Sequence, residues 1–269
     1  MGRFHRHEDG TVHSHDHGDQ AHDHPHVHDH DHADLVGDNS AYATHTERVE
    51  VLERIFEEND AAAVANRAAF DAAGVVAINV MSSPGAGKTA VLERTLAALE
   101  PQVRCGVIEG DIETSLDADR LDGLAAQVSL LNTGHGFGGE CHLDAPMVAR
   151  ALRGLDLAGL DVVFIENVGN LVCPAEFDVG AHRRAMIASV TEGEDKPLKY
   201  PVMFRSVDVV VINKMDLLPY LDFDLDAFEA NIALVNPHAR VLRASARTGE
   251  GLDEWLSWVR DLRTLPGAA

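Results

Sequence analysis

The residues with the clearest chemical potential follow the apolar run 75–81 and precede a helical pattern that extends from Ala90 to Glu100. They read Ser82-Ser83-Pro84-Gly85-Ala86-Gly87-Lys88-Thr89. In such a turn, backbone N–H groups surround phosphate oxygens, and the helix that follows directs its positive end at them. Lys88 would reach the terminal phosphates and the Thr89 hydroxyl would hold Mg²⁺. The stretch predicts a P-loop, although Ser82 occupies the position of the motif's first glycine. The phosphate contacts are expected from Gly85, Ala86, Gly87, Lys88, Thr89 and Ala90.

Two carboxylates end other apolar runs. Asp111 follows the run 105–108, where it could bind Mg²⁺, orient the attacking water or begin a helix near Ile112. Glu166 ends the run 161–165, and Gly169 lies three residues further on. This spacing resembles the D-x-x-G element of GTPases, in which the glycine N–H senses the γ-phosphate. We therefore expect Lys88, Asp111 and Glu166 to be catalytic, and Thr89, Asp111 and Glu166 to hold Mg²⁺.

A guanine signature, Asn213-Lys214-Met215-Asp216, ends the buried run 207–212. The Asp216 carboxylate can accept hydrogen bonds from both N1–H and the 2-amino group of guanine, which adenine does not offer in that arrangement. Lys214 would lie along the base and Asn213 would tie this segment to the P-loop. After the run 239–244, Ser245 and Ala246 begin an S-A-x-T-G sequence, in which the Ala246 N–H can contact guanine O6. The nucleotide is predicted to be GTP.

Two further segments offer metal ligands of another kind. Cys141 and His142 follow the glycine-rich stretch 132–139, and Cys173 lies four residues after Gly169. Thiolate and imidazole groups suit Zn²⁺ and Ni²⁺. From the residues alone, a buried thiol beside a capping histidine explains the Cys-His pair equally well.

The first 34 residues differ in composition from the rest, because eleven of the sixteen histidines fall between His5 and His32. Such a segment has too little apolar surface to fold, so we expect a disordered tail over residues 1–34. Imidazoles at short, flexible spacing bind Ni²⁺ or Zn²⁺, whereas a purification tag is normally an uninterrupted histidine run. The expected tail ligands are His13, His15, His17, His22, His24, His26, His28, His30 and His32.

The composition narrows the class of protein. The 22 Lys and Arg residues against 44 Asp and Glu residues give a formal net charge of −22, which argues against nucleic acid and anionic membranes as partners. We find no secretory signal and no membrane-spanning run. Three cysteines without close pairing fit reduced thiols in the cytoplasm.

The remaining patterns place these residues on a fold. Strand, loop and helix patterns alternate across residues 35–269, which predicts an α/β P-loop NTPase domain with a mainly parallel sheet. A long helix is expected from Thr44 to Phe70, with a possible break at Asn59-Asp60, and residues 191–201 are expected to form a charged loop. A final helix over 252–262 would bury Trp255, Leu256 and Val259.

Residues from Thr44 to Leu262 resemble the nickel-incorporation GTPases of [NiFe]-hydrogenase maturation (HypB-type). The resemblance rests on the P-loop, on the segments 140–144 and 166–174, and on the run 191–197. It implies a GTP-dependent homodimer with Ni²⁺ or Zn²⁺ at the subunit interface, bound by Cys141, His142 and Cys173. It also implies two partners, a hydrogenase maturation protein and the hydrogenase large subunit. A cysteine-rich N-terminal nickel motif found in some members is absent before Cys105, and the histidine tail could store nickel instead.

Two other functions remain open at this stage. The chain could be a nickel storage protein with a secondary nucleotide domain, or a GTPase chaperone for another metalloenzyme such as urease or a cobalamin enzyme. Urease-type relatives carry a Cys-Pro-His metal motif, whereas this chain has Glu-Cys-His and a remote cysteine.

Overall fold

A computed structural model describes the backbone of residues 4–6, 12–14, 45–111, 121, 123–132 and 141–262. The chain divides into two compact units, Met1–Glu47 and Arg48–Ala269. In the first unit, β1 (Phe4–Arg6) pairs antiparallel with β2 (Val12–Ser14). These two strands lie within the segment 1–34, for which disorder was expected, and the rest of that segment lies outside the described residues. The side chains of the nine predicted tail ligands also lie outside the described residues.

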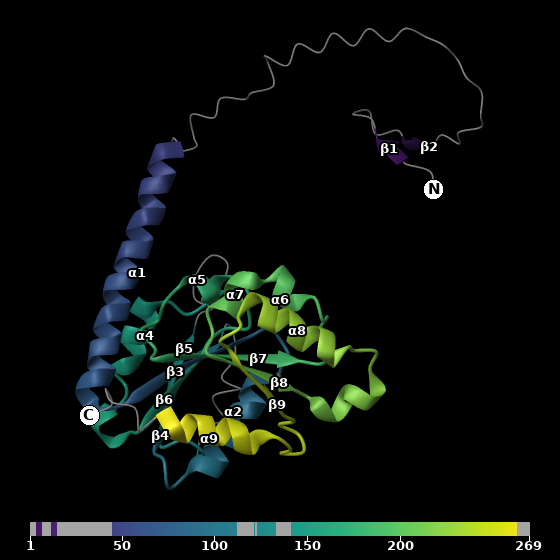
Figure 1. Cartoon of the computed structure of the whole chain (residues 1–269). Coiled ribbons are helices and arrows are strands. Elements are labelled where there is room, and N and C mark those ends of the chain that lie inside the picture. Colours follow the sequence, from purple (N-terminus) through teal and green to yellow (C-terminus); the bar gives the residue numbers. More distant parts are fainter. Residues whose placement is uncertain are drawn as a thin grey trace, which may run out of the picture. The chain divides into compact units, whose positions relative to one another are not determined.

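The second unit is built on a seven-stranded sheet in the order β5-β4-β6-β3-β7-β8-β9, in which every neighbouring pair is parallel (Figure 1). This confirms the expected P-loop NTPase class. The strands are β3 (Val76–Ser82), β4 (Cys105–Asp111), β5 (Gln127–Asn132), β6 (Val162–Glu166), β7 (Arg183–Ser189), β8 (Val209–Asn213) and β9 (Arg240–Arg243). The register pairs Val80 with Glu166 and Glu109 with Glu166, so β3, β4 and β6 end together. The phosphate and carboxylate residues are therefore gathered at one edge of the sheet.

Helices cover both faces of this sheet (Figure 1). They are α1 (His45–Ala73), α2 (Lys88–Leu99), α4 (Ala145–Leu152), α5 (Cys173–Glu176), α6 (Lys196–Lys199), α7 (Pro201–Arg205), α8 (Leu225–Val235) and α9 (Leu252–Leu262), with 3₁₀ turns η3 (Leu157–Gly159) and η4 (Met215–Tyr220). The sequence patterns did not predict α4 or α8. The expectation of a loop over 191–201 is wrong in part, because α6 forms there with ion pairs from Lys196 to Glu192 and from Lys199 to Asp195.

Successive residues of the central strand, β3, are buried against helices on opposite faces of the sheet. Val76, Ile78 and Val80 of β3 are buried with residues of α2 and α9, whereas Ala77 lies with residues of α1 and α4. Trp255, Leu256 and Val259 of α9 are buried as predicted. The Trp255 indole N–H donates to Thr95 Oγ1 of α2 at 2.8 Å, so the two helices are joined by a buried hydrogen bond as well as by packing.

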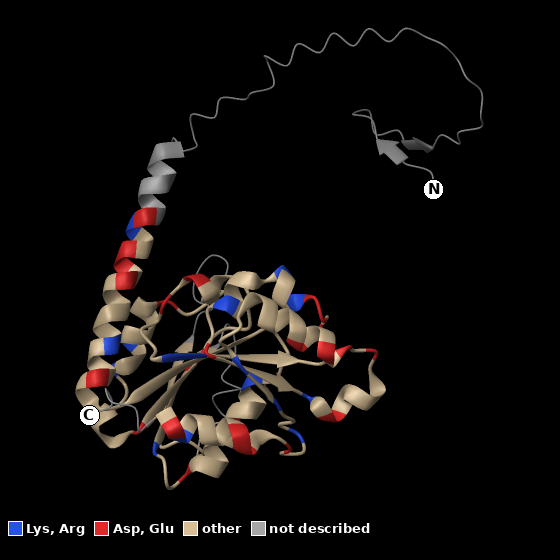
Figure 2. Ribbon diagram, in the orientation of Figure 1, with Lys and Arg blue, Asp and Glu red and all other residues tan. Residues whose placement is uncertain are grey.

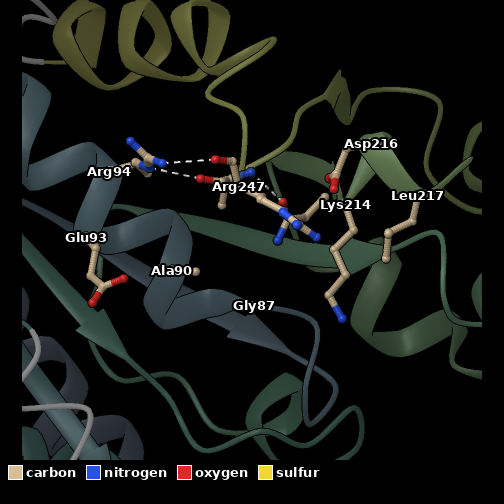
Figure 3. A pocket seen from close by; sticks show the side chains of 10 residues that line it. Gly87, Ala90, Glu93, Arg94, Lys214, Asp216, Leu217 and Arg247 are labelled. Atoms are coloured by element: carbon tan, nitrogen blue, oxygen red, sulfur yellow. Dashed lines mark hydrogen bonds between the residues drawn. The ribbon is translucent and has the colours of Figure 1, made fainter.

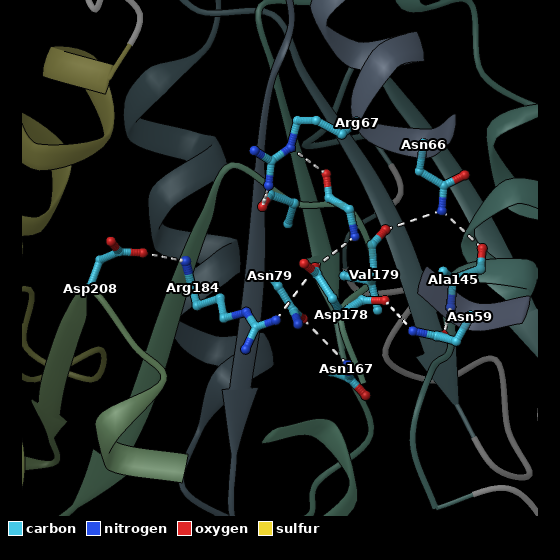
Figure 4. A network of polar contacts seen from close by, with 12 residues as sticks. Asn59, Asn66, Arg67, Asn79, Ala145, Asn167, Asp178, Val179, Arg184 and Asp208 are labelled. Atoms are coloured by element: carbon cyan, nitrogen blue, oxygen red, sulfur yellow. Dashed lines mark hydrogen bonds and ion pairs between the residues drawn. The ribbon is translucent and has the colours of Figure 1, made fainter. Parts of the chain in front are cut away.

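Helix α1 is continuous, and the break considered at Asn59-Asp60 does not occur. Asn59 is buried and uses its side chain for tertiary contacts: Nδ2 donates to the Asp178 carbonyl and Oδ1 accepts from the Ala145 N–H, both at 2.9 Å. Asn66 Nδ2 likewise donates to the carbonyls of Ala145 and Val179 (Figure 4). These bonds offset the low helix propensity of asparagine and fix α1 to the segments around Ala145 and Asp178.

Acidic residues recur along the described part of α1 and on α9 (Figure 2). Among the residues with described placement, no helix is both long and apolar enough to span a membrane.

Candidate functional site

The P-loop joins β3 to α2 and has the geometry that phosphate binding requires. Gly87 immediately precedes α2 with φ at 98°, in the left-handed region that favours glycine. A Cβ atom at Gly87 would lie 2.6 Å from Asn213 Nδ2, so a side chain is excluded by space as well as by conformation. A Cβ at Gly85 would meet nothing within 4 Å, which leaves this part of the loop open to a ligand.

Three predicted phosphate and Mg²⁺ residues meet beside this loop. Thr89 Oγ1 donates to Glu166 Oε1 at 2.7 Å, and Lys88 Nζ lies 3.7 Å from the same oxygen. The second oxygen of Glu166, Oε2, is buried and has no hydrogen-bond partner among the described residues. A buried carboxylate oxygen without a partner is unfavourable unless a cation or donor binds there. Two hard oxygen donors, Thr89 and Glu166, therefore fit a Mg²⁺ ion held with a nucleotide phosphate.

Two further predicted residues lie at the ends of neighbouring strands, because Gly169 follows β6 and Asp111 ends β4. A Cβ atom at Gly169 would lie 3.1 Å from Pro84 Cα, so the predicted γ-phosphate sensor packs directly on the P-loop. The backbone of Asp111 ends β4 at the same edge of the sheet, but its side chain lies outside the described side chains. Its expected roles toward Mg²⁺ and water therefore stay predictions.

A pocket of about 340 Å³ lies between α2 and the loops that follow β8 and β9 (Figure 3). Its lining includes the predicted base-binding residues Asn213, Lys214, Asp216 and Ala246, together with Gly87 and Ala90 of the predicted phosphate contacts. Asn213 Nδ2 donates to the Ala86 carbonyl at 2.9 Å, which confirms the tie to the P-loop.

The polar groups of this pocket hold one another in place. Ser245 Oγ donates to Asp216 Oδ1 at 2.6 Å and aims the carboxylate. The Ala246 N–H, expected to contact guanine O6, donates at 3.0 Å to Asn213 Oδ1. Lys214 Nζ donates to the Gly85 carbonyl at 2.6 Å. The backbone of Lys214 is in the left-handed region, with φ at 62°.

Arg94 on α2 belongs to the pocket and was not singled out by the sequence. Its Nε donates to the Ala246 carbonyl at 2.9 Å and a terminal guanidinium nitrogen donates to the Arg247 carbonyl at 3.0 Å (Figure 3). The P-loop helix therefore positions the loop that follows β9. No motif contains this arginine, and only the fold brings it to that loop.

The second cluster consists of Cys141, His142 and Cys173, whose ligand atoms all lie within 4.8 Å of one another. Cys141 Sγ is 3.0 Å from Cys173 Sγ and 3.7 Å from His142 Nδ1. The hydrogen bond between the two thiols and, to a smaller extent, burial raise the pKa of the Cys173 thiol above its usual value. Two thiolates on one tetrahedral metal ion stand about 3.8 Å apart, so a small separation of the sulfurs would admit a metal ion. Among the described residues, these three form the one group of Cys, His, Asp or Glu side chains whose ligand atoms lie close enough together to hold a metal ion.

Two elements support this cluster. Cys173 begins α5, directly after the segment that carries Gly169. The His142 ring packs on Phe177 with centroids 4.3 Å apart, and Phe177 stacks on Phe56 of α1 at 5.2 Å. The orientation of His142 therefore depends on α1, which no local sequence pattern reveals.

Comparison with known proteins gives the family of this chain. The model of the CobW/HypB/UreG nucleotide-binding domain matches residues 76–243. Hydrogenase maturation factor HypB of Azotobacter chroococcum mcd 1 is 49% identical over 217 residues, which cover 80% of this chain and 69% of that protein. The chain belongs to the HypB family of hydrogenase maturation factors.

Solved HypB structures have the same fold. HypB from Archaeoglobus fulgidus matches with a TM-score of 0.71 and 36% identity, covering 77% of this chain and 100% of that one. HypB from Helicobacter pylori, solved in complex with nickel, matches with a TM-score of 0.71 and 34% identity, covering 77% and 95%. The family is one of nucleotide-binding P-loop proteins, as the motifs predicted.

Proposed function

We propose that this HypB-family chain hydrolyses GTP to GDP and phosphate and uses the nucleotide state to control delivery of Ni²⁺ to [NiFe]-hydrogenase in the cytoplasm. The observation that carries the proposal is the short connection between the sites: Glu166, Gly169 and Cys173 lie on one segment, with Glu166 beside Lys88 and Cys173 beside Cys141. The nickel complex of the Helicobacter pylori protein supports the choice of metal.

In the nucleotide half, the chain's own residues bind and orient GTP. The phosphates would accept hydrogen bonds from the N–H groups of Gly85, Ala86 and Gly87. The Lys88 ammonium would neutralise part of their charge, and Gly169 would contact the γ-phosphate. Asp216 would read guanine, with Ser245 aiming the carboxylate, and the Ala246 N–H would turn from Asn213 Oδ1 to guanine O6. Thr89 and Glu166, with Asp111 as a further ligand, would hold Mg²⁺, which when bound stabilises charge on the transferred phosphoryl group.

In the metal half, Cys141, His142 and Cys173 would supply three ligands to Ni²⁺, or to Zn²⁺ in competition with it. A fourth position stays open for a ligand from a second subunit or from the recipient protein. We therefore propose a GTP-dependent homodimer that acts with a hydrogenase maturation protein and the hydrogenase large subunit.

Residues 1–34 are proposed to be a separate metal-binding segment, with residues 35–269 as the nucleotide domain. Its histidines would hold several ions weakly and increase the local supply of nickel. Protons would compete for the same nitrogens as the pH falls through about 6.5.

The test measures hydrogenase activity in a strain that lacks this protein and expresses variants of it, with and without added nickel. Delivery predicts that Lys88→Ala and Cys173→Ala each abolish activity when the tail is intact, at all nickel levels. The storage alternative predicts that only deletion of residues 1–34 matters and that added nickel does not replace it. If Lys88→Ala and Cys173→Ala both retain full activity, the proposed delivery mechanism is wrong.

A parallel measurement in vitro tests the reaction itself. Phosphate release from GTP is expected to be at least about 100-fold faster than from ATP, because only guanine offers two donors to Asp216. Equal rates would refute the assignment of the base pocket.

A further inference from the structure

The peptide groups on the two sides of His142 are both bound by side chains of the segment that follows β6. Asn167 Oδ1 accepts the N–H of Leu143 at 2.9 Å, and Asn170 Nδ2 donates to the carbonyl of Cys141 at 3.2 Å. These two asparagines lie on either side of Val168 and Gly169, so the predicted γ-phosphate sensor holds the backbone of a predicted metal ligand from both sides.

Asn167 is the stronger connection, because a single oxygen serves both segments. The same Oδ1 that accepts the Leu143 N–H also accepts the N–H of Val168 at 2.9 Å. Asn167 is 1% exposed and Leu143 is 0% exposed, so water does not reach this bond to replace it. A displacement of the segment 167–169 must therefore either move Leu143 or leave a buried N–H without a partner, which is unfavourable.

Leu143 has little freedom to adapt without moving the ligands beside it. A Cβ atom at Gly110 would lie 2.7 Å from Leu143 Cγ, so the side chain is packed closely on the end of β4. On the other side, Gly169 packs against Pro84 of the P-loop. Asn167 thus lies between Leu143, a tightly packed residue of the segment 141–145 (the metal segment), and the loop that is expected to receive the phosphates.

Asn167 also reaches the strand that leads into the P-loop. Its Nδ2 donates to Asn79 Oδ1 of β3 at 3.4 Å (Figure 4), whereas Asn79 Nδ2 is buried with no hydrogen-bond partner among the described residues. One buried side chain is therefore bonded to Leu143, to Val168 beside the predicted γ-phosphate sensor, and to β3.

We propose that Asn167, assisted by Asn170, is the positioning residue that transmits the nucleotide state to His142 and Cys141. This rests on the proposed function, because it needs GTP at the P-loop and Ni²⁺ at Cys141, His142 and Cys173. When Gly169 moves toward a γ-phosphate, the two asparagines rotate the peptide groups that flank His142 and so change the geometry offered to the metal.

The test measures the ratio of Ni²⁺ affinities in two nucleotide states of the full-length protein. Nickel is titrated in the presence of GDP and of the β,γ-imido analogue of GTP, and binding is followed by thiolate-to-nickel charge-transfer absorption. Because no cysteine precedes Cys105, the histidine tail contributes nothing to this signal. Nucleotide affinity is measured separately with a fluorescent GDP analogue.

Coupled sites typically show a ratio of about 5 to 150. Asn167→Ala is expected to bring the ratio to within about twofold of one while GDP affinity is retained. Asn170→Ala, at a half-buried residue outside the helices and strands, is expected to reduce the ratio in part. Asn59→Ala is the matched control, since Asn59 also binds the metal segment, at Ala145, but from α1. It is expected to change both affinities equally and leave the ratio unchanged.

The outcomes separate this inference from the proposed function. A wild-type ratio above one that persists in Asn170→Ala and in folded Asn167→Ala overturns only the role of the asparagines. An equal loss of the ratio in Asn59→Ala also overturns it, because the effect is then general loosening of the metal segment. A wild-type ratio of one removes the coupling from the proposed function, and the inference with it.

Discussion

Asp216 is the proposed reader of the base, so replacing it with asparagine should exchange one nucleotide for another. Its carboxylate lines the pocket and accepts one hydrogen bond from Ser245 Oγ. With guanine bound, it would accept two more, from N1–H and the 2-amino group. Asparagine keeps one acceptor and places an amide donor against the guanine 2-amino group. Xanthine has a carbonyl there, which accepts from that amide.

The size of the effect follows from the bonds that change. A hydrogen bond to a charged group contributes about 1.5–3 kcal/mol, and asparagine loses one such bond. The opposed donors add a further unfavourable contact, so the loss should reach about 2–4 kcal/mol, or about 30- to 1,000-fold in Kd for GDP.

The assay is titration with fluorescent analogues of GDP and XDP against the wild type, Asp216→Asn and Asp222→Asn. Asp222 carries the same charge six positions further along the chain and does not line the pocket, so its variant controls for net charge. Asp216→Asn should lose GDP affinity and gain XDP affinity, and Asp222→Asn should leave both unchanged. GDP binding by Asp216→Asn within twofold of the wild type would refute this geometry of base recognition.

Four further changes have defined outcomes. Lys88→Ala should lower GTP hydrolysis at least about 100-fold, measured by phosphate release, because the phosphates lose their ammonium partner; a smaller effect would mean that Lys88 does not reach them. Arg94→Ala should weaken GDP binding about tenfold, since the loop after β9 loses two hydrogen bonds, and Arg94→Lys should recover only part of the loss. Asn66→Ala should lower the free energy of unfolding by about 2–4 kcal/mol in urea, because it leaves two buried carbonyls without that donor; a change below ~0.5 kcal/mol would contradict the role given to this residue. Deleting residues 1–34 should reduce the number of nickel ions bound in equilibrium dialysis and leave GTP hydrolysis unchanged, and a loss of hydrolysis would show that the tail belongs to the enzyme.

The sequence predicted those parts of the molecule whose chemistry restricts the residue type. A phosphate loop needs glycines and a lysine, and guanine needs a carboxylate, so Gly87, Lys88 and Asp216 were found with the strands that carry them. The metal cluster was different, because 32 residues separate Cys141 from Cys173 and only the family resemblance joined them before the fold did.

Other parts could not be predicted because they depend on contacts between distant segments. Asn59 and Asn66 suggest a weak helix when taken alone, and they stabilise α1 only through bonds to residues 79 to 119 positions away. Arg94 belongs to no motif, and Asn167 lies inside the segment 166–174 at a position to which the spacing of Glu166 and Gly169 assigns no chemistry. The missed helix α4 did have a local signal: Asp144 caps it by accepting the Met147 N–H at 2.7 Å, and a proline follows in its first turn.

The backbone of Lys214 has a conformation that is unusual for a residue with a side chain. Among the described residues other than glycine, Lys214 alone has a positive φ, a conformation that costs a residue with a side chain about 1–2 kcal/mol. Lys214→Gly would relieve that strain and at the same time remove the ammonium that reaches the Gly85 carbonyl. Because a hydrogen bond from a charged group contributes about as much as the strain costs, glycine would leave the stability nearly unchanged, and the loss would fall on nucleotide binding.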